Sequence, residues 1–173
     1  MTNPVLQAIA ERRSNRGYSP EQISQEQLDA ILEAAQQAPS ASNRQPWYFT
    51  VVQNQEIVKE VNEEACKIHN REGDIFYGAP TVIFLSCDRS TRWGLHDCAY
   101  AVQNIALAAH SMGLGSVILG LPDAAFTGPR KEYFDQLLKF PEGFGFAVAI
   151  AIGIPTVTKD AHPIHADRIT YIV

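Results

Sequence analysis

Hydrophobic residues recur at intervals of three and four along several stretches of the chain, which predicts amphipathic helices. The first predicted helix begins at Asn3, an N-cap followed by proline at the first helical position. The second begins at Ser24, which forms a capping box with Gln27, and it ends where Pro39 prevents its continuation. Helices are predicted over residues 4–13, 25–38, 55–69, 95–112 and 129–138.

Short apolar runs without helical periodicity lie between these helices and predict strands. The runs cover residues 47–52, 81–85, 116–119, 146–154 and 169–173. Residues 81–85 and 146–154 show no alternation of apolar and polar positions, which is typical of strands covered on both faces. About five strands with helices between them and no internal repeat indicate a layered domain of the α/β or α+β type.

The stretch 95–112 is small or apolar around nearly its whole circumference, so we expect a buried core helix. His96, Asp97 and Gln103 interrupt it too often for a membrane span. We interpret His96 and Asp97 as the polar edge of this helix rather than as a catalytic dyad. The helix is also a candidate for a subunit interface, and Gly113 is expected to end it as a C′ glycine.

Composition limits the class of protein. The chain has 173 residues, 46% of them hydrophobic, which predicts one domain over residues 1–173 with a core that needs no metal or disulfide. The net charge of −5 argues against general polyanion binding, so no nucleic-acid partner is expected. Cys66, Cys87 and Cys98 have no C-x-x-C spacing, which indicates free thiols in a reducing compartment. Residues 1–10 lack a basic segment followed by an apolar run, so we expect a cytoplasmic protein without a membrane partner.

Several common site signatures are missing from the sequence. Residues 113–115 read Gly-Leu-Gly, but they follow a predicted helix and precede a predicted strand, the reverse of the order in a dinucleotide-binding fingerprint. The chain contains no nucleophile elbow, no P-loop and no H-E-x-x-H motif. His162 and His165 are too few ligands to predict a metal site, so none is expected.

Two polar segments remain as candidate binding sites. Arg12-Arg13-Ser14-Asn15-Arg16 follows the first predicted helix, where basic residues either complement the helix dipole or bind an anion. Residues 38–49 place small polar side chains between Pro39 and Pro46 and then become a strand. This second segment is either an ordinary loop or one that wraps a ligand with side-chain and backbone donors.

Taken together, the motifs of the chain resemble those of the flavin-dependent nitroreductase family. The resemblance rests on an R-R-S-x-R element, a P-S-x-x-N-x-Q-P-W element, a G-A-P before a strand, a Q-N-x-x-L-A-A helix and an M-G-L-G-S turn. These lie at residues 12–16, 39–47, 78–80, 103–109 and 112–116. They occur in family order and span nearly the whole chain, so their combination is specific although each is weak alone.

The resemblance implies an α+β, nitroreductase-like fold with a mixed central sheet of about five strands, assembled as a homodimer that binds FMN. Arg12 and Ser14 would hold the FMN phosphate, whose negative charge suits a guanidinium, and Arg16 would reach the pyrimidine end of the ring. Residues 39–43 would cover the flavin of the other subunit, and residues 118–120 would lie beside its ring. The implied cofactor-binding residues are Arg12, Arg13, Ser14, Arg16, Pro39, Ser40, Ala41, Ser42, Asn43, Ile118, Leu119, Gly120, His165 and Arg168.

The C-terminal region departs from the family pattern, which usually supplies a second basic pair to the phosphate. Only His165 and Arg168 are available there, so either of them is a candidate to complete the site. The implied activity is reduction of nitroaromatics, quinones or similar acceptors by NAD(P)H in a ping-pong mechanism, with no catalytic side chain. Two other interpretations remain open: a flavin carrier or redox sensor without NAD(P)H turnover, and a structural dimer without a cofactor.

Overall fold

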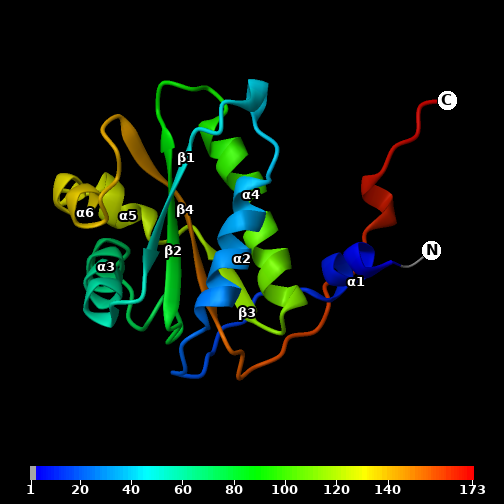
Figure 1. The fold of residues 1–173 in the computed structure, drawn as a ribbon, viewed down its shortest axis with the longest axis horizontal. Helices are drawn as coiled ribbons and strands as arrows, with labels where there is room; N and C mark the ends of the chain where they lie inside the picture. The colour runs from blue at the N-terminus through cyan, green and yellow to red at the C-terminus, as the bar shows by residue number, and fades with distance from the viewer. Residues whose placement is uncertain (1–2) are drawn as a thin grey trace.

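The computed structural model describes residues 3–173, and Figure 1 shows the arrangement of its elements. The helices are α1 Pro4–Glu11, α2 Gln25–Gln36, α3 Gln55–Ile68, α4 Gly94–Ser111, α5 Asp123–Thr127 and α6 Lys131–Leu137. The strands are β1 Trp47–Val52, β2 Thr81–Asp88, β3 Gly115–Leu119 and β4 Phe144–Gly153. Two short 3-10 helices, Ala41–Asn43 and Ala166–Arg168, complete the set.

The strands form one sheet in the order β1-β2-β4-β3, and every neighbouring pair is antiparallel. The expectation of a mixed sheet with about five strands was therefore wrong for the described residues 3–173. Helices cover both faces of this sheet, so its central strands are continuously apolar although none of the pairs is parallel (Figure 1). Absence of alternation indicated burial correctly but carried no information about strand direction.

Residues 169–173, expected to form the last strand, lie in an exposed tail. The backbone at Ile169 is extended, with φ −119° and ψ 125°, and the segment is rich in β-branched residues. A strand also requires a neighbouring edge for its backbone hydrogen bonds. The tail runs away from the sheet, so the extended segment has no such neighbour (Figure 1).

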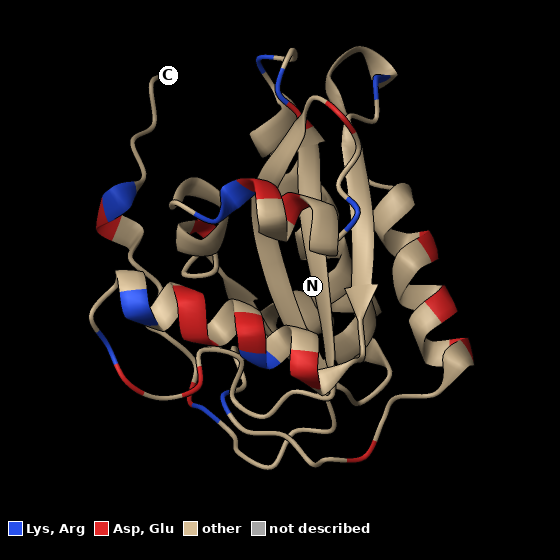
Figure 2. Cartoon of the chain, turned by 90° about the vertical axis from the view of Figure 1, so that its left-hand side faces the viewer, with Lys and Arg blue, Asp and Glu red and all other residues tan. Residues whose placement is uncertain are grey.

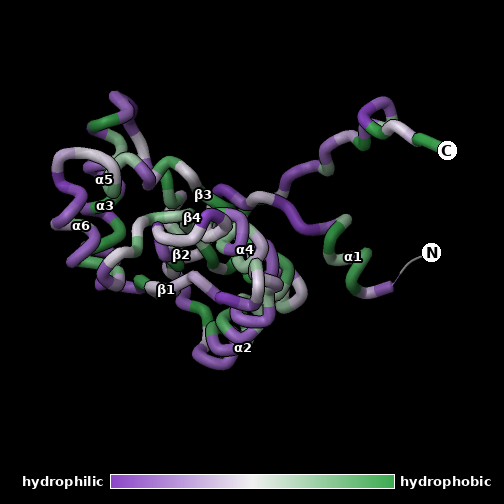
Figure 3. The backbone as a smooth tube through the Cα atoms, turned by 90° about the horizontal axis from the view of Figure 1, so that it is seen from above, coloured by the Kyte–Doolittle hydropathy of each residue, from purple (hydrophilic) through white to green (hydrophobic). Residues whose placement is uncertain are grey.

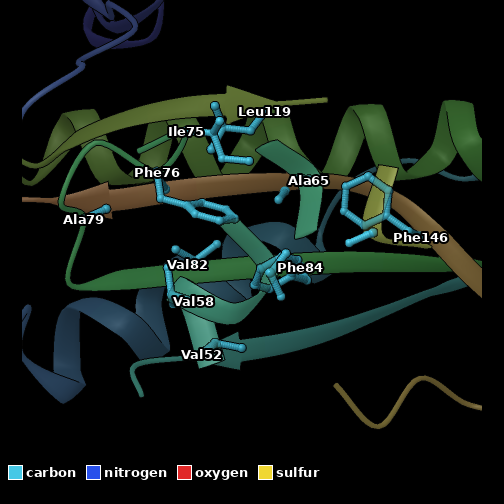
Figure 4. Packing of buried hydrophobic residues seen from close by; sticks show 14 of the residues in the cluster. Val52, Val58, Ala65, Ile75, Phe76, Ala79, Val82, Phe84, Leu119 and Phe146 are labelled. Carbon is cyan, nitrogen blue, oxygen red and sulfur yellow. The ribbon is translucent and has the colours of Figure 1, made fainter. Parts of the chain in front are cut away.

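Each face of the sheet has its own hydrophobic core. α2 and α4 pack on one face, against Ile83 and Leu85 of β2. α3, α5 and α6 cover the other face, against Val82 and Phe84 of the same strand. Figure 4 shows part of this second core, where Phe84 lies among side chains from α3, β1 and the segment before β2. The alternation along β2 divides its side chains between the two cores.

The local helix signals in the sequence are confirmed. The Asn3 side chain accepts a hydrogen bond from the backbone of Leu6. Ser24 and Gln27 form both halves of the capping box at the start of α2. Gly113, with φ +76°, follows α4 as its C′ residue. These signals work because each satisfies backbone groups locally, without help from the rest of the fold.

The boundaries of two predicted helices need correction. α1 ends at Glu11, so the arginines follow the helix instead of occupying its last turn. The predicted helix over 129–138 begins at Lys131, and a separate short helix, α5, precedes it. α5 is only five residues long and begins without a side-chain cap, which explains why no periodic pattern marked it.

Charged residues lie almost entirely outside the sheet. Figure 2 shows the strands free of Lys, Arg and Glu, and Asp88 at the end of β2 is the one acidic residue in the four strands. Within residues 3–173 there is no helix with the length and apolar character required to cross a bilayer.

Candidate functional site

The basic segment at residues 12–16 runs along the outer edge of β3. Ser14 forms a parallel bridge with Ser116, and the Asn15 N–H donates to the Ser116 carbonyl at 2.9 Å. The chain then turns to the segment that follows β4, where Gly17 accepts a hydrogen bond from the Thr156 N–H at 3.0 Å and Tyr18 forms a bridge with Pro155. The fold thus joins residues 12–16 to the strand that leads into residues 118–120.

The two adjacent arginines have different surroundings. The Arg13 guanidinium donates to the carbonyls of Ala10 at 2.6 Å and Arg12 at 2.9 Å, so it caps the end of α1. The Arg12 guanidinium is partly buried and makes no hydrogen bond or ion pair with another side chain or backbone group in residues 3–173. Arg12 is therefore the cation of this pair that is available to an anionic ligand.

Tyr18 fixes the far end of the basic segment. Its hydroxyl donates to the Asn15 carbonyl at 2.8 Å, and its backbone forms a bridge with Pro155. Burial raises the pKa of Tyr18 above its ordinary value, so the ring stays neutral and keeps its donor. The neighbouring Arg16 guanidinium lies over the Tyr77 ring, 5.9 Å from its centroid. The backbone between these contacts is held while the Arg16 side chain remains at the surface.

The end of β3 combines an exposed side chain, that of Ile118, with an uncrowded backbone at Gly120. The Ile118 side chain is 39% exposed, whereas Leu119 is buried in the core under α3. Gly120 follows the strand, and a Cβ at this position would meet no atom within 4 Å. The backbone here is consequently accessible for close approach of a planar ligand.

The loop over residues 39–45 has an unusual backbone. Ser42, Asn43 and Gln45 have φ values of 54°, 53° and 49°, in the left-handed region that residues other than glycine rarely adopt. Internal hydrogen bonds brace the loop: the Gln45 N–H donates to Ser40 Oγ at 3.0 Å, and Gln45 Nε2 donates to Asn43 Oδ1 at 3.1 Å. The loop is thus a defined shape and not merely a flexible connection.

This loop does not meet the basic segment within one chain. It leads into β1, while residues 12–16 lie beside β3, at the opposite edge of the sheet (Figure 1). Three strand spacings separate these edges, roughly 14 Å at about 4.8 Å per spacing. A ligand at the basic segment could meet such a loop only if a second chain brought it there.

His165 and Arg168 lie on the exposed tail. His165 Nδ1 is 3.9 Å from Asp167 Oδ1, an acidic neighbour in its own segment. Neither residue forms a hydrogen bond or ion pair with the basic segment within residues 3–173. Like residues 39–43, these two expected binding residues are not brought near Arg12 by any contact in the described chain.

Asp97, which the sequence analysis set aside as a polar edge, is a buried residue of this region. It lies on α4 and is 2% exposed, and its Oδ1 accepts a hydrogen bond from the Ala41 N–H at 3.1 Å. A charged residue inside an otherwise apolar helix was the signal that could have identified it.

The thiols of Cys87 and Cys98 are neighbours between β2 and α4. All three cysteines are free and buried. The Cys98 thiol donates to the Ser86 carbonyl at 3.8 Å. The neighbouring Cys98 lowers the pKa of Cys87, while interaction with Cys87 and burial raise the pKa of Cys98. No group of three or more metal-ligating side chains occurs in the part of the chain that the structure describes.

A cavity of about 380 Å³ lies beside the basic segment. Arg13, Asn15, His110, Leu114 and Lys159 contribute to its lining. It includes Arg13 but none of the other expected FMN-binding residues, so it is separate from the groups expected to hold the phosphate.

Comparisons with known proteins agree on one family. The model of the Nitroreductase family matches residues 9–154. A nitroreductase with bound FMN from Desulfitobacterium hafniense has a TM-score of 0.93 and 39% identity, covering 100% of both chains. A nitroreductase with bound FMN from Bacteroides fragilis has a TM-score of 0.90 and 30% identity, covering 99% of this chain and 100% of that one. The "Putative NADH dehydrogenase/NAD(P)H nitroreductase" of Methanothermobacter thermautotrophicus is 37% identical over 155 residues, 87% of this chain and 77% of that protein.

Proposed function

Because the chain belongs to the nitroreductase family, we propose that it is an FMN-dependent oxidoreductase that uses NAD(P)H to reduce nitroaromatics, quinones or similar electron-poor acceptors. Residues 1–173 would form one FMN-binding domain. The observation that carries this proposal is the junction of residues 12–16 with β3, because it places Arg12, whose side chain has no partner in residues 3–173, beside the strand that leads to the open backbone at Gly120.

The residues at this junction fit FMN. Arg12 and Ser14 would hold the phosphate, with Arg13 bracing the backbone behind them. Arg16 would lie by the pyrimidine end of the flavin, and the open backbone at Gly120 would lie beside the ring. When bound, FMN supplies the hydride chemistry; the side chains of the protein bind it, orient it and tune it. No side chain of the chain is required as an acid or base in this scheme.

The chemistry can be tested with the purified protein. We expect a yellow protein whose flavin absorbance bleaches when NADPH is added under argon and returns when a quinone is added. Reconstitution with FMN after removal of the flavin is the control for loss of cofactor during purification. Colour without bleaching would favour a carrier or sensor, and a protein that stays colourless after reconstitution would refute FMN binding.

We also propose that the working form is a homodimer with two flavin sites at the interface. α1 and the C-terminal tail stand away from the body on the same side, as Figure 3 shows. They expose apolar residues that a second chain would bury, among them Val5, Ile9, Ile164 and Ile172. A homodimer would also bring residues 39–43 of one chain to the basic segment of the other, which one chain alone does not do.

Light scattering on the purified protein is expected to give the mass of a dimer, with flavin lost when the dimer dissociates on dilution. The reason is that each site would draw groups from both chains, so neither chain alone would hold FMN tightly. A monomer that retained one FMN per chain would contradict this prediction.

A further inference from the structure

Asp97 is a buried carboxylate that forms no ion pair with any other residue of the described chain. It is 2% exposed, and Oδ2 is buried without a hydrogen-bond partner in residues 3–173. Its other oxygen, Oδ1, accepts from the Ala41 N–H at 3.1 Å. Burying a carboxylate is costly unless hydrogen bonds to the charged form compensate for the lost hydration. The contact that Asp97 makes is to the loop over residues 39–45.

That contact is the loop's tether to the rest of the fold. The other hydrogen bonds of residues 39–45 stay inside the loop, from Asn43 and Arg44 to the carbonyls of Ser40 and Ala41 and between side chains of the loop. In the described chain, the Asp97 bond is the one hydrogen bond that joins these residues to another element. The internal hydrogen bonds define the conformation of the loop, and the hydrogen bond to Asp97 fixes the position of the loop relative to α4.

A role for Asp97 in α4 alone does not account for its burial. It lies in the first turn of α4, where a negative charge stabilises the helix dipole. An exposed carboxylate would serve that purpose equally well, without desolvation. Asp123 and Glu132 occupy the first turns of α5 and α6 and are not buried.

We propose that Asp97 is a positioning residue for FMN, which holds Ser40–Asn43 so that they cover the flavin bound by the partner chain. This inference rests on the proposed function and extends it to a residue outside the motifs. Asp97 would act through the Ala41 backbone and would not touch the flavin. Without the charged acceptor, the left-handed residues of the loop would relax to commoner backbone conformations, and the loop would no longer be held over the partner chain's flavin.

Fluorescence titration of FMN into Asp97→Ala and Asp97→Asn tests the proposal. Loss of a charge-assisted hydrogen bond is expected to weaken FMN binding by about tenfold to a hundredfold in Asp97→Ala. Asp97→Asn keeps an acceptor oxygen of the same shape, so its dissociation constant should lie between those of Asp97→Ala and the wild type. Asp135→Ala is the matched control, since Asp135 of α6 also has a buried oxygen without a partner. It should leave FMN affinity unchanged.

Mixed dimers separate positioning from a general loss of stability. A dimer of one Asp97→Ala chain and one Arg12→Ala chain, isolated with two different tags, would have one site with both defects and one with neither. We expect one tight FMN per mixed dimer, although both homodimers bind weakly. If Asp97→Ala does not fold, the same mixture is made with Asp97→Asn.

Two results would overturn this inference while leaving the proposed function intact. The first is wild-type FMN affinity in Asp97→Ala; the second is a mixed dimer without a tight site, because Asp97 would then act within its own chain. Failure of the wild-type protein to bind FMN would instead refute the proposed function.

Discussion

Replacing Arg12 with alanine is expected to weaken FMN binding by about one to two decades. A charge-assisted contact between guanidinium and phosphate contributes roughly 1.5–3 kcal/mol, and about 1.4 kcal/mol corresponds to a tenfold change in dissociation constant. The Arg12 guanidinium has no hydrogen-bond or ion-pair partner in residues 3–173, so the substitution should remove ligand contacts without breaking the fold. Fluorescence titration of FMN into the apoprotein measures the effect.

Arg13→Ala is the matched control for this prediction. Arg13 already donates to the carbonyls of Ala10 and Arg12, so its loss should reduce FMN affinity less than the loss of Arg12. Unchanged FMN affinity in Arg12→Ala would show that the phosphate lies elsewhere. A larger effect in Arg13→Ala than in Arg12→Ala would show that Arg13, and not Arg12, is the main ligand of the phosphate.

Phe126→Ala is expected to lower the free energy of unfolding by about 3–5 kcal/mol, the usual range for a buried phenylalanine. Phe126 is 2% exposed and stacks on Phe146, with ring centroids 4.7 Å apart and planes 3° apart. It also packs on Phe84, Phe134 and Phe140 at centroid distances of 6.0, 6.1 and 5.3 Å. Removing the ring would leave a cavity in contact with α6 and the two central strands.

Urea denaturation of the apoprotein measures this loss, at one protein concentration because dimerisation would make stability depend on concentration. Tyr133→Ala, which removes a ring that is 43% exposed on α6, is the matched control and should cost much less. A loss below about 1 kcal/mol for Phe126→Ala would mean that the cluster repacks around the gap.

The sequence predicted those features of the fold that depend on neighbouring residues. The capping box at Ser24 and the C′ glycine at Gly113 satisfy backbone groups within a few positions, so their patterns are sufficient. The short helix α5 and the antiparallel order of the sheet depend on contacts between distant segments. Residues 169–173 illustrate the same limit, because an extended sequence becomes a strand only beside another edge.

The candidate site also combines features that the sequence shows locally with contacts between distant segments that it does not show. The motif at residues 12–16 was visible in the sequence, and the fold joins it to β3. The sequence showed Asp97 as a charged residue in an apolar helix but could not show its partner, because the bond to Ala41 spans 56 positions and depends on the packing of α2 against α4. The roles of His165 and Arg168 stay predictions, since no contact in residues 3–173 joins these exposed residues to the basic segment.

In the proposed homodimer, the separation of the loop at residues 39–45 from the basic segment, at opposite edges of the sheet, would have a genetic consequence. A chain that lacks both Arg12 and Asp97 would damage both sites of any dimer it joins. Its own site would lack the arginine that binds the phosphate, and its partner's site would lack a correctly positioned loop over the flavin. An allele that encodes this doubly substituted chain would therefore be dominant negative when co-expressed with the wild type. Two chains that each lack one of these residues would instead complement each other at a single site.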